Sequence, residues 1–393
     1  MKRFCALTLA LLLVTGTALA EDSGEINPEP FAEADNKSSF GAPDITSPSA
    51  ILIERETGEV LFEKNADDPR EPASVTKVMT MLLTVEAIES GRLSLDDIVT
   101  ASEHAAGMGG TNIYLFAGER MSVRDMLKAV ATNSANDCAS ALAEHLAGSE
   151  SGFADKMNAR AAELGMTNTH FSNASGLLDD TNHVTTARDI AVMSRELIRH
   201  DLIKQFTTIW TDSVRNGGFE LANTNKLIRY YEGATGLKTG YTSRAGYCVS
   251  ATAERGGVGF VAVVMGDKTS AERFESARLL LNYAFAGFTT VAAEPDEALR
   301  PIPVELGRQE YIQPVVSGRT RLLVRLEDAK NIERRAELTP RLKAPVNEGD
   351  VVGRLTLSAN GKTLGEFPLV ASQGSARLTW VHILGKILAF YFT

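Results

Sequence analysis

Ser74 and Lys77 are the residues in this sequence whose types and spacing point most directly to chemistry. They lie in PASVTKVMT, residues 72–80, at the start of an apolar run with helical spacing. A serine hydroxyl is a weak nucleophile until a base accepts its proton, and side chains three positions apart share one face of a helix. Burial or a second nearby cation would favour the neutral, basic form of Lys77. The pair predicts a nucleophilic serine with a lysine as its general base.

Two further segments carry polar side chains that such an enzyme would use. Ser134 and Asn136 lie in TNSANDCAS, at the head of a predicted helix, and Lys238-Thr239-Gly240 lies in GLKTGYTS, on a predicted edge strand. A Ser-x-x-Lys quartet is expected about once or twice by chance in a chain of ordinary composition, and a Lys-Thr-Gly triplet about once in ten chains. All three in this order are far less expected by accident, so they indicate one catalytic site.

The same trio occurs in class A β-lactamases and penicillin-binding proteins, with Ser-Asp-Asn as the middle element. The likeness extends to the segments MGGTNIYLFAGE, ELGMTNTHFSN, HVTTARD and AGYCVSA, and it spans residues 49–288. The sequence thus resembles the D-alanyl-D-alanine carboxypeptidases, which are low-molecular-mass penicillin-binding proteins. The resemblance implies an enzyme that removes the terminal D-alanine from the pentapeptide stem of peptidoglycan through a serine acyl-enzyme, and that binds β-lactam antibiotics covalently.

The resemblance also implies roles for the first two motifs. Ser74 would be the nucleophile and Lys77 its base. Ser134 and Asn136 would shuttle protons and hold the amide of the peptide.

The third motif would recognise the end of the substrate. Lys238 and Thr239 would bind its terminal carboxylate, and the resemblance places the oxyanion hole at the backbone N–H groups of Ser74 and of Tyr241, which follows Gly240. Some relatives carry a histidine at the position of Tyr241, so a role for that imidazole does not transfer to this chain. Arg273 falls where some relatives place an arginine beside the substrate carboxylate.

Two alternative functions share parts of this pattern. A β-lactamase would use the same trio, but the sequence contains no Glu-x-x-Leu-Asn element of the kind that positions the deacylating water in class A enzymes. A non-catalytic wall-binding module would be expected to have lost Ser74, Lys77 or Lys238, and all three are present. The carboxypeptidase is therefore the preferred interpretation.

The elements that must position these residues predict an α+β fold. Residues 50–65 and 236–267 each read as strands around a turn, and helical periodicity covers residues 122–145, 153–164, 187–199 and 270–285. Strands at both ends with helices between them predict one antiparallel sheet covered by helices. This is the β-lactamase/transpeptidase-like architecture that the resemblance implies.

Beyond residue 290 the periodicity changes to short alternating strands with an Asn360-Gly361 turn, which predicts a small all-β domain. In the terminal RLTWVHILGKILAFYF, Thr379, His382 and Lys386 share one face of a predicted amphipathic helix. Residues 377–393 would span about 25 Å, short of the ~30 Å hydrocarbon core. We therefore expect a helix lying in the membrane surface, with a buried core helix as the alternative.

The N-terminus predicts export. Residues 1–20 combine two basic residues, an apolar run and a small-residue exit, as in a cleaved secretory signal. The predicted parts are a signal peptide (1–20), a flexible linker (21–44), a penicillin-binding serine peptidase domain (45–290), a small all-β domain (291–373) and the membrane-anchor helix (374–393). This organisation places the protein at the outer face of the cytoplasmic membrane or in the cell wall.

Composition excludes several other classes of function. The net charge of −10, without any basic block, excludes nucleic acid as a partner. No histidine or cysteine pattern forms a metal motif, so no metal and no other cofactor is expected. Cys138 and Cys248 are predicted to be small buried side chains, although the sequence leaves open whether they pair. His183 and Asp189 could border the cleft, but a helix cap or a core contact is the preferred interpretation for each.

Overall fold

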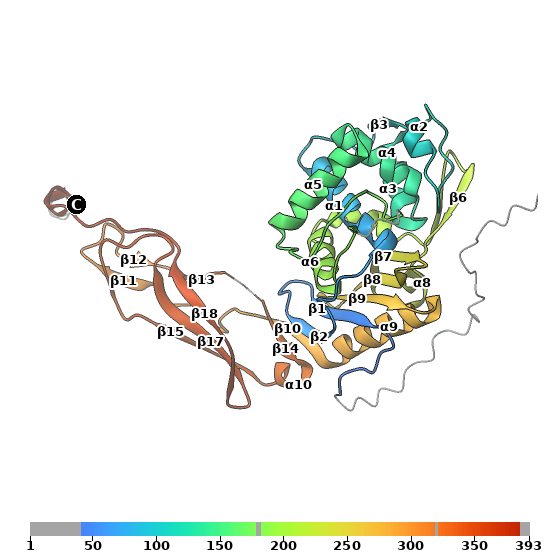
Figure 1. Cartoon of the computed structure of the whole chain (residues 1–393). Helices are drawn as coiled ribbons and strands as arrows, with labels where there is room; N and C mark the ends of the chain where they lie inside the picture. The colour runs from blue at the N-terminus through green and yellow to red at the C-terminus, as the bar shows by residue number, and fades with distance from the viewer. Residues whose placement is uncertain (1–40, 178–181, 319–320, 386–393) are drawn as a thin grey trace, which may run out of the picture. The chain divides into compact units, whose positions relative to one another are not determined.

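The computed structural model describes residues 41–177, 182–318 and 321–385 of the chain (Figure 1). The predicted signal peptide and residues 21–40 of the predicted linker lie outside the described residues.

A five-stranded antiparallel sheet is the centre of the part of the structure that precedes residue 288. Its strand order is β2-β1-β9-β8-β7, so β1 joins the N-terminal pair to β9, a strand from much later in the chain. The strands are β1 (Ser49–Glu54), β2 (Val60–Lys64), β7 (Ala234–Thr242), β8 (Gly246–Arg255) and β9 (Val258–Asp267). The predicted sheet is therefore confirmed, with the Lys-Thr-Gly strand β7 at its edge.

Both faces of the sheet are covered by helices, as Figure 1 shows. Alternation along β9 explains the two layers: Phe260 faces the core shared with α9, and Val261 faces the core shared with the other helices. The helices are α1 (Lys77–Glu89), α2 (Glu103–Ala106), α3 (Val123–Thr132), α4 (Asn136–Ala147), α5 (Glu150–Glu163), α6 (Ala187–Leu197), α7 (Asp201–Thr207), α8 (Leu227–Tyr230) and α9 (Ser270–Gly287). Two short antiparallel strand pairs, β3 (Ile98–Thr100) with β4 (Arg120–Ser122) and β5 (Thr211–Val214) with β6 (Phe219–Ala222), lie outside this sheet.

The helical periodicity predicted over residues 122–145 is interrupted in the structure. α3 ends at Thr132 and α4 begins at Asn136, and Ser134 between them has a φ of +64°. A left-handed residue cannot continue a right-handed helix, and Asn and Ser compete with helical hydrogen bonds through their side chains. The apolar pattern continues across the break because both helices pack against the same core.

The C-terminal part is built from short strands, which confirms the predicted small all-β domain. Its longest hairpin joins β17 (Val351–Ala359) to β18 (Lys362–Ala371) through Asn360 and Gly361, whose φ angles of +53° and +77° suit a two-residue turn. The other strands are β10 (Phe288–Ala292), β11 (Ile302–Glu305), β12 (Tyr311–Ile312), β13 (Pro314–Val316), β14 (Arg321–Arg325), β15 (Ile332–Leu338) and β16 (Leu342–Lys343), with a single turn of helix, α10 (Leu326–Ala329).

The end of the described chain shows only the start of the predicted terminal helix. Residues 380–385 are helical, and Trp380 and Val381 are largely exposed. Lys386 and the residues after it lie outside the described residues. Within the described part of the chain, no helix is both long enough and apolar enough to cross a bilayer.

Cys138 and Cys248 are both free thiols, and both are completely buried. Burial raises the pKa of Cys138 well above its usual value and raises the pKa of Cys248 to about 11. We therefore predict that neither thiol reacts with Ellman's reagent at pH 8 in the folded protein and that both react in denaturant. Mapping the modified cysteines by mass spectrometry would measure this, and rapid modification of either in the native protein would contradict it.

Candidate active site

Ser74 lies in a tight turn that precedes α1. The turn is a single 3₁₀ segment, η1 (Ala73–Thr76), with Pro72 as its N-cap, and the next residue, Lys77, begins α1. Ala73 has a φ of +46°, a left-handed conformation that a non-glycine residue adopts at a cost of about 1–3 kcal/mol. The backbone immediately before the predicted nucleophile is therefore strained and must be held by its surroundings.

The side chain of Lys77 is completely buried and bonds to three oxygens. Its Nζ atom donates to Ser74 Oγ at 2.9 Å, to Asn136 Oδ1 at 2.6 Å and to the carbonyl oxygen of Ser175 at 2.9 Å. None of these three partners carries a negative charge that would hold the amine in its charged form. The lysine is therefore placed to take a proton from the serine hydroxyl.

Ser134 and Asn136 reach the same point from the break between α3 and α4. Asn136 is the first residue of α4, and its Nδ2 atom donates to the carbonyl oxygen of Gly109 at 2.8 Å while its Oδ1 atom accepts from Lys77. Because both ends of this amide are bonded, its orientation is fixed. Ser134 stands two residues before it, on the strained turn, and is mostly buried.

β7 brings the Lys-Thr-Gly triplet against the serine turn. A Cβ atom added to Gly240 would lie 2.7 Å from the carbonyl oxygen of Pro72 and 3.1 Å from the backbone nitrogen of Ser74, so only glycine allows this approach. Lys238 is buried, with Nζ donating to the carbonyl oxygen of Thr239 at 3.0 Å, and the Thr239 hydroxyl donates to Thr224 Oγ1 at 2.7 Å.

Arg273 and Tyr241 both lie next to the Lys-Thr-Gly triplet and differ in their exposure to solvent. Arg273 on α9 is buried, and its Nη1 atom donates to the carbonyl oxygens of Gly240 at 3.1 Å and Cys248 at 3.4 Å. Tyr241 is 42% exposed and stacks on Tyr247 with ring centroids 4.2 Å apart. The buried arginine thus binds the backbone of the triplet, whereas the tyrosine is exposed to solvent.

The sequence analysis missed the segment around residues 172–176, which forms the fourth side of the site. Ser175 supplies a carbonyl oxygen to Lys77, and Thr80 donates its hydroxyl to the carbonyl oxygen of Ala174 at 2.7 Å. A Cβ atom at Gly176 would overlap the carbonyl oxygen of Ala73. The run of small residues in FSNASG is the feature of the sequence that could have indicated this segment. Because the segment acts through backbone donors and acceptors, it requires no distinctive residue type.

His183 and Asp189 make core contacts of the kind expected. His183 is buried and bonds to Thr76 behind the serine turn. Asp189, in the first turn of α6, accepts from the backbone N–H of Asn168 at 3.1 Å and from the Thr169 hydroxyl at 2.7 Å. Burial raises the pKa of Asp189, although these hydrogen bonds oppose the shift.

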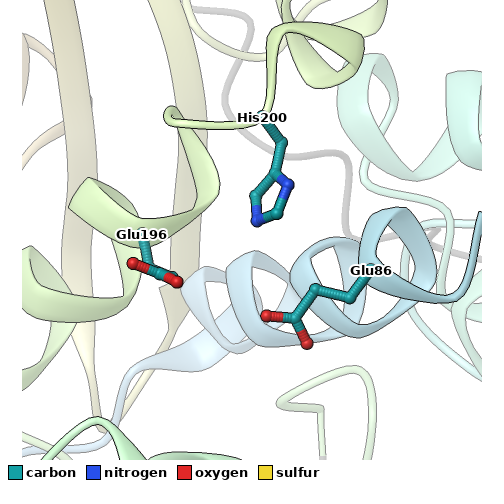
Figure 2. A group of neighbouring side chains, drawn as sticks. All are labelled: Glu86, Glu196 and His200. Atoms are coloured by element: carbon teal, nitrogen blue, oxygen red, sulfur yellow. The ribbon is translucent and has the colours of Figure 1, made fainter. Parts of the chain in front are cut away.

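A group of possible metal ligands lies near the C-terminal end of α1, away from the serine turn. Figure 2 shows Glu86, Glu196 and His200, which offer ligand atoms within 4.8 Å of one another. Arg160 already bridges the two carboxylates, with Nη2 at 2.8 Å from Glu86 and 3.0 Å from Glu196, and His200 Nδ1 lies 2.6 Å from Glu89. A cation therefore occupies the place between the carboxylates, and we assign the group to an ion-pair network that joins α1, α5 and α6.

The fold and the site together define a class of protein. A helix-covered antiparallel sheet places a Ser-x-x-Lys pair against Ser-x-Asn and Lys-Thr-Gly, which is the arrangement of a penicillin-binding serine peptidase. Comparison with known proteins gives the family: residues 36–269 match the model for D-alanyl-D-alanine carboxypeptidases (peptidase S11), and residues 289–376 match the C-terminal domain of penicillin-binding protein 5. The chain belongs to the D-alanyl-D-alanine carboxypeptidase family, and the predicted serine-type hydrolase is confirmed.

Similar proteins match over most of the chain. The D-alanyl-D-alanine carboxypeptidase DacF of Bacillus subtilis is 37% identical over 92% of this chain and 94% of its own. Penicillin-binding protein 5 of Haemophilus influenzae has a TM-score of 0.77 at 28% identity, covering 86% of this chain and 99% of its own. Penicillin-binding protein D2 of Listeria monocytogenes, solved in its ampicillin-bound form, has a TM-score of 0.57 at 34% identity, over 62% of this chain and 100% of its own.

The close approach at Gly240 gives a direct test of this geometry. Gly240→Ala would force the Lys-Thr-Gly strand away from the serine turn, and a displacement of about 1 Å can reduce a catalytic rate about 100-fold. We predict that this variant is acylated by a penicillin about 10- to 100-fold more slowly than wild type.

Gly259→Ala is the matched control, because the three atoms nearest to its Cβ, at 3.1–3.3 Å, all belong to the side chain of Arg55 and none to the backbone. The control should keep the wild-type acylation rate. An unchanged rate for Gly240→Ala would show that the strand does not need this close approach.

Proposed function

We propose that this enzyme removes the terminal D-alanine from peptidoglycan pentapeptide stems, with Ser74 as nucleophile and Lys77 as its base. The observation that carries the assignment is the 2.9 Å hydrogen bond between Lys77 Nζ and Ser74 Oγ, made by a fully buried lysine. Asn136 and the Ser175 carbonyl oxygen hold the same nitrogen, so it stays directed at the hydroxyl. The family match supports the reaction, and the geometry supports these roles.

The proposed reaction proceeds through an acyl-enzyme. Neutral Lys77 accepts the hydroxyl proton as Ser74 Oγ attacks the carbonyl carbon between the two D-alanines. The C–N bond of the tetrahedral intermediate then breaks, and the leaving D-alanine takes a proton that Lys77 and the Ser134 hydroxyl relay to its amine. Water afterwards attacks the ester, releasing the shortened stem and returning the proton to Ser74.

Backbone donors are proposed to stabilise the oxyanion of both intermediates. The N–H groups of Ser74 and Tyr241 are the candidates, because β7 packs at Gly240 directly against the backbone nitrogen of Ser74. Donors fixed where negative charge develops contribute about 3–4 kcal/mol each to the transition state. Because Gly240 has no side chain, β7 and the serine turn can approach closely enough for their N–H groups to share one pocket.

The free carboxylate of the substrate requires cations and hydroxyl donors in the site. We propose that Lys238 and Thr239 bind this carboxylate, since both belong to the strand that faces the serine turn. Arg273 binds the carbonyl oxygen of Gly240. It would contribute by polarising that peptide group and by adding positive charge to the pocket.

β-Lactams should enter the same site. Their strained amide and carboxylate present the groups that a D-Ala-D-Ala end presents, and the Listeria relative was solved with ampicillin bound. We propose that Ser74 forms a covalent penicilloyl ester in this chain too. Turnover of β-lactams as the primary activity is not favoured, because the chain matches the carboxypeptidase family over both of its parts.

The location of the enzyme is proposed from the substrate and the tail. Peptidoglycan lies outside the cytoplasm, and the apolar side chains of Trp380, Val381 and Leu384 are exposed at the end of the described chain. We propose that the protein is exported through its N-terminal segment and attaches to the outer face of the cytoplasmic membrane through its C-terminal segment.

The assignment of nucleophile and base predicts different outcomes for two variants. Ser74→Ala should abolish both hydrolysis of a D-Ala-D-Ala peptide and covalent labelling by penicillin. Lys77→Arg keeps the positive charge but cannot act as a base, so it should be acylated at least about 100-fold more slowly. Stopped-flow measurement of penicillin acylation, with circular dichroism to check folding, gives these rates.

Lys128→Arg is the matched control, because Lys128 is a partly buried lysine that pairs with Asp125 and Asp212 on the protein surface. It should keep the wild-type rate. A near-normal rate for Lys77→Arg would mean that Lys77 has only a structural role.

The proposal that the C-terminal segment attaches the protein to the membrane is best tested by truncating the chain after Leu378. Ser375 is buried and pairs with Val346, and Leu378 donates its N–H to the Leu306 carbonyl oxygen, so a deletion starting at residue 375 would damage the β domain. Removing residues 379–393 should release the enzyme from the membrane fraction while its peptidase activity is retained. Continued membrane association of this active, truncated protein would rule out the tail as the anchor.

A further inference from the structure

Ala73 is the strained point of the active site. Its φ of +46° turns the chain immediately before Ser74, and the residue is 2% exposed. An alanine gains nothing by itself from a left-handed conformation, so neighbouring groups must stabilise it. The hydrogen bonds of its carbonyl group show which neighbours do so.

The side chain of Thr76 stabilises this turn. Its hydroxyl donates to the carbonyl oxygen of Ala73 at 2.8 Å, and its side chain is completely buried. Because the single hydroxyl proton is used in this bond, Thr76 Oγ1 can only accept from its other partner. That partner is His183, whose Nε2 atom lies at 2.8 Å.

The backbone of the neighbouring segment sets the tautomer of His183. The N–H of Ser172 donates to His183 Nδ1 at 3.0 Å, so Nδ1 is the acceptor and the ring proton lies on Nε2. The ring is 3% exposed and packs edge-on against Phe171, with centroids 5.7 Å apart. The result is a directed chain of hydrogen bonds from Ser172 through His183 and Thr76 to Ala73.

This chain of hydrogen bonds also connects two sides of the active site. Ser172 precedes the small-residue segment whose Ser175 carbonyl oxygen binds Lys77, and Gly176 of that segment packs on the carbonyl group of Ala73. His183 therefore ties the segment that orients the base to the turn that presents the nucleophile. Neither Thr76 nor His183 needs to touch the substrate to have this effect.

We propose that His183 is a positioning residue of this enzyme, which acts through Thr76 to hold Ala73 in the conformation that presents the Ser74 hydroxyl to Lys77. The inference rests on the proposed role of Ser74 as nucleophile. A histidine that only filled space against Phe171 would affect stability but would not affect catalysis through Thr76.

A double-mutant cycle on the full-length protein separates these two roles. His183→Phe keeps an aromatic ring and removes the hydrogen bonds of the imidazole, including those to Thr76 and Ser172. Thr76→Val keeps the shape of threonine and removes its hydroxyl. Each single variant should be acylated by penicillin about 10- to 100-fold more slowly, because the serine turn relaxes from its strained geometry. The double variant should be no slower than the slower single variant, because both substitutions break the same chain of hydrogen bonds.

Steady-state kinetics provide a second readout. With a D-Ala-D-Ala peptide, kcat should fall in both single variants while KM changes less than about twofold, because neither residue binds the substrate. Thr76→Ser keeps the hydroxyl and should restore a rate close to that of wild type. His170→Phe is the matched control, because His170 is an exposed histidine whose ring bonds to the Asn182 carbonyl group, away from the serine turn, and this variant should acylate normally.

Three results would overturn the proposal: a wild-type acylation rate in His183→Phe, a wild-type rate in Thr76→Val, or losses that multiply in the double variant. Covalent labelling of Ser74→Ala would instead overturn the assignment of the nucleophile. The two failures are therefore distinguishable within one set of measurements.

Discussion

The burial of the Lys77 side chain is the constraint on which the rest of this active site depends. An amine removed from water loses its solvent hydrogen bonds, and an unpaired buried polar group costs several kcal/mol. Here three oxygens replace the water, and they come from the serine turn, from the first residue of α4 and from the segment around Ser175. Because each oxygen belongs to a different part of the chain, satisfying one nitrogen requires these three segments to be assembled around it.

Close backbone packing then determines how far these parts can move. Gly240 and Gly176 each lie where a Cβ atom would collide with the serine turn, one from β7 and the other from the opposite segment. The turn is therefore held between two backbones, and this confinement compensates for the left-handed conformation of Ala73. Rigid placement of the nucleophile between a base and an oxyanion pocket is what serine acyl transfer requires.

The sequence predicted the parts of the site that depend on distinctive residue types. Ser74, Lys77, Asn136 and Lys238 could be found because a nucleophile, a base and a carboxylate partner require particular side chains. The sheet and its helical cover could be predicted as well, because apolar periodicity distinguishes strands from helices.

Backbone chemistry could not be predicted in the same way. The carbonyl group of Ser175 is available in any residue, and no local pattern indicates that Ala73 adopts a positive φ. The break at Ser134 could not be predicted either, because the apolar residues of α3 and α4 follow one continuous pattern and pack into the same core. For His183 a core or capping role was preferred over a place beside the cleft, because its link to the serine turn depends on a contact between positions 76 and 183.

The measurement that tests the central claim most directly is the location of the covalent penicillin adduct in the wild-type enzyme. After acylation and digestion with trypsin, the account predicts the adduct on the peptide Glu71–Lys77, which contains Ser74 as its one serine. Tandem mass spectrometry would identify the modified residue. An adduct on the peptide containing Ser134 would contradict the account, because the buried lysine would then serve a different nucleophile.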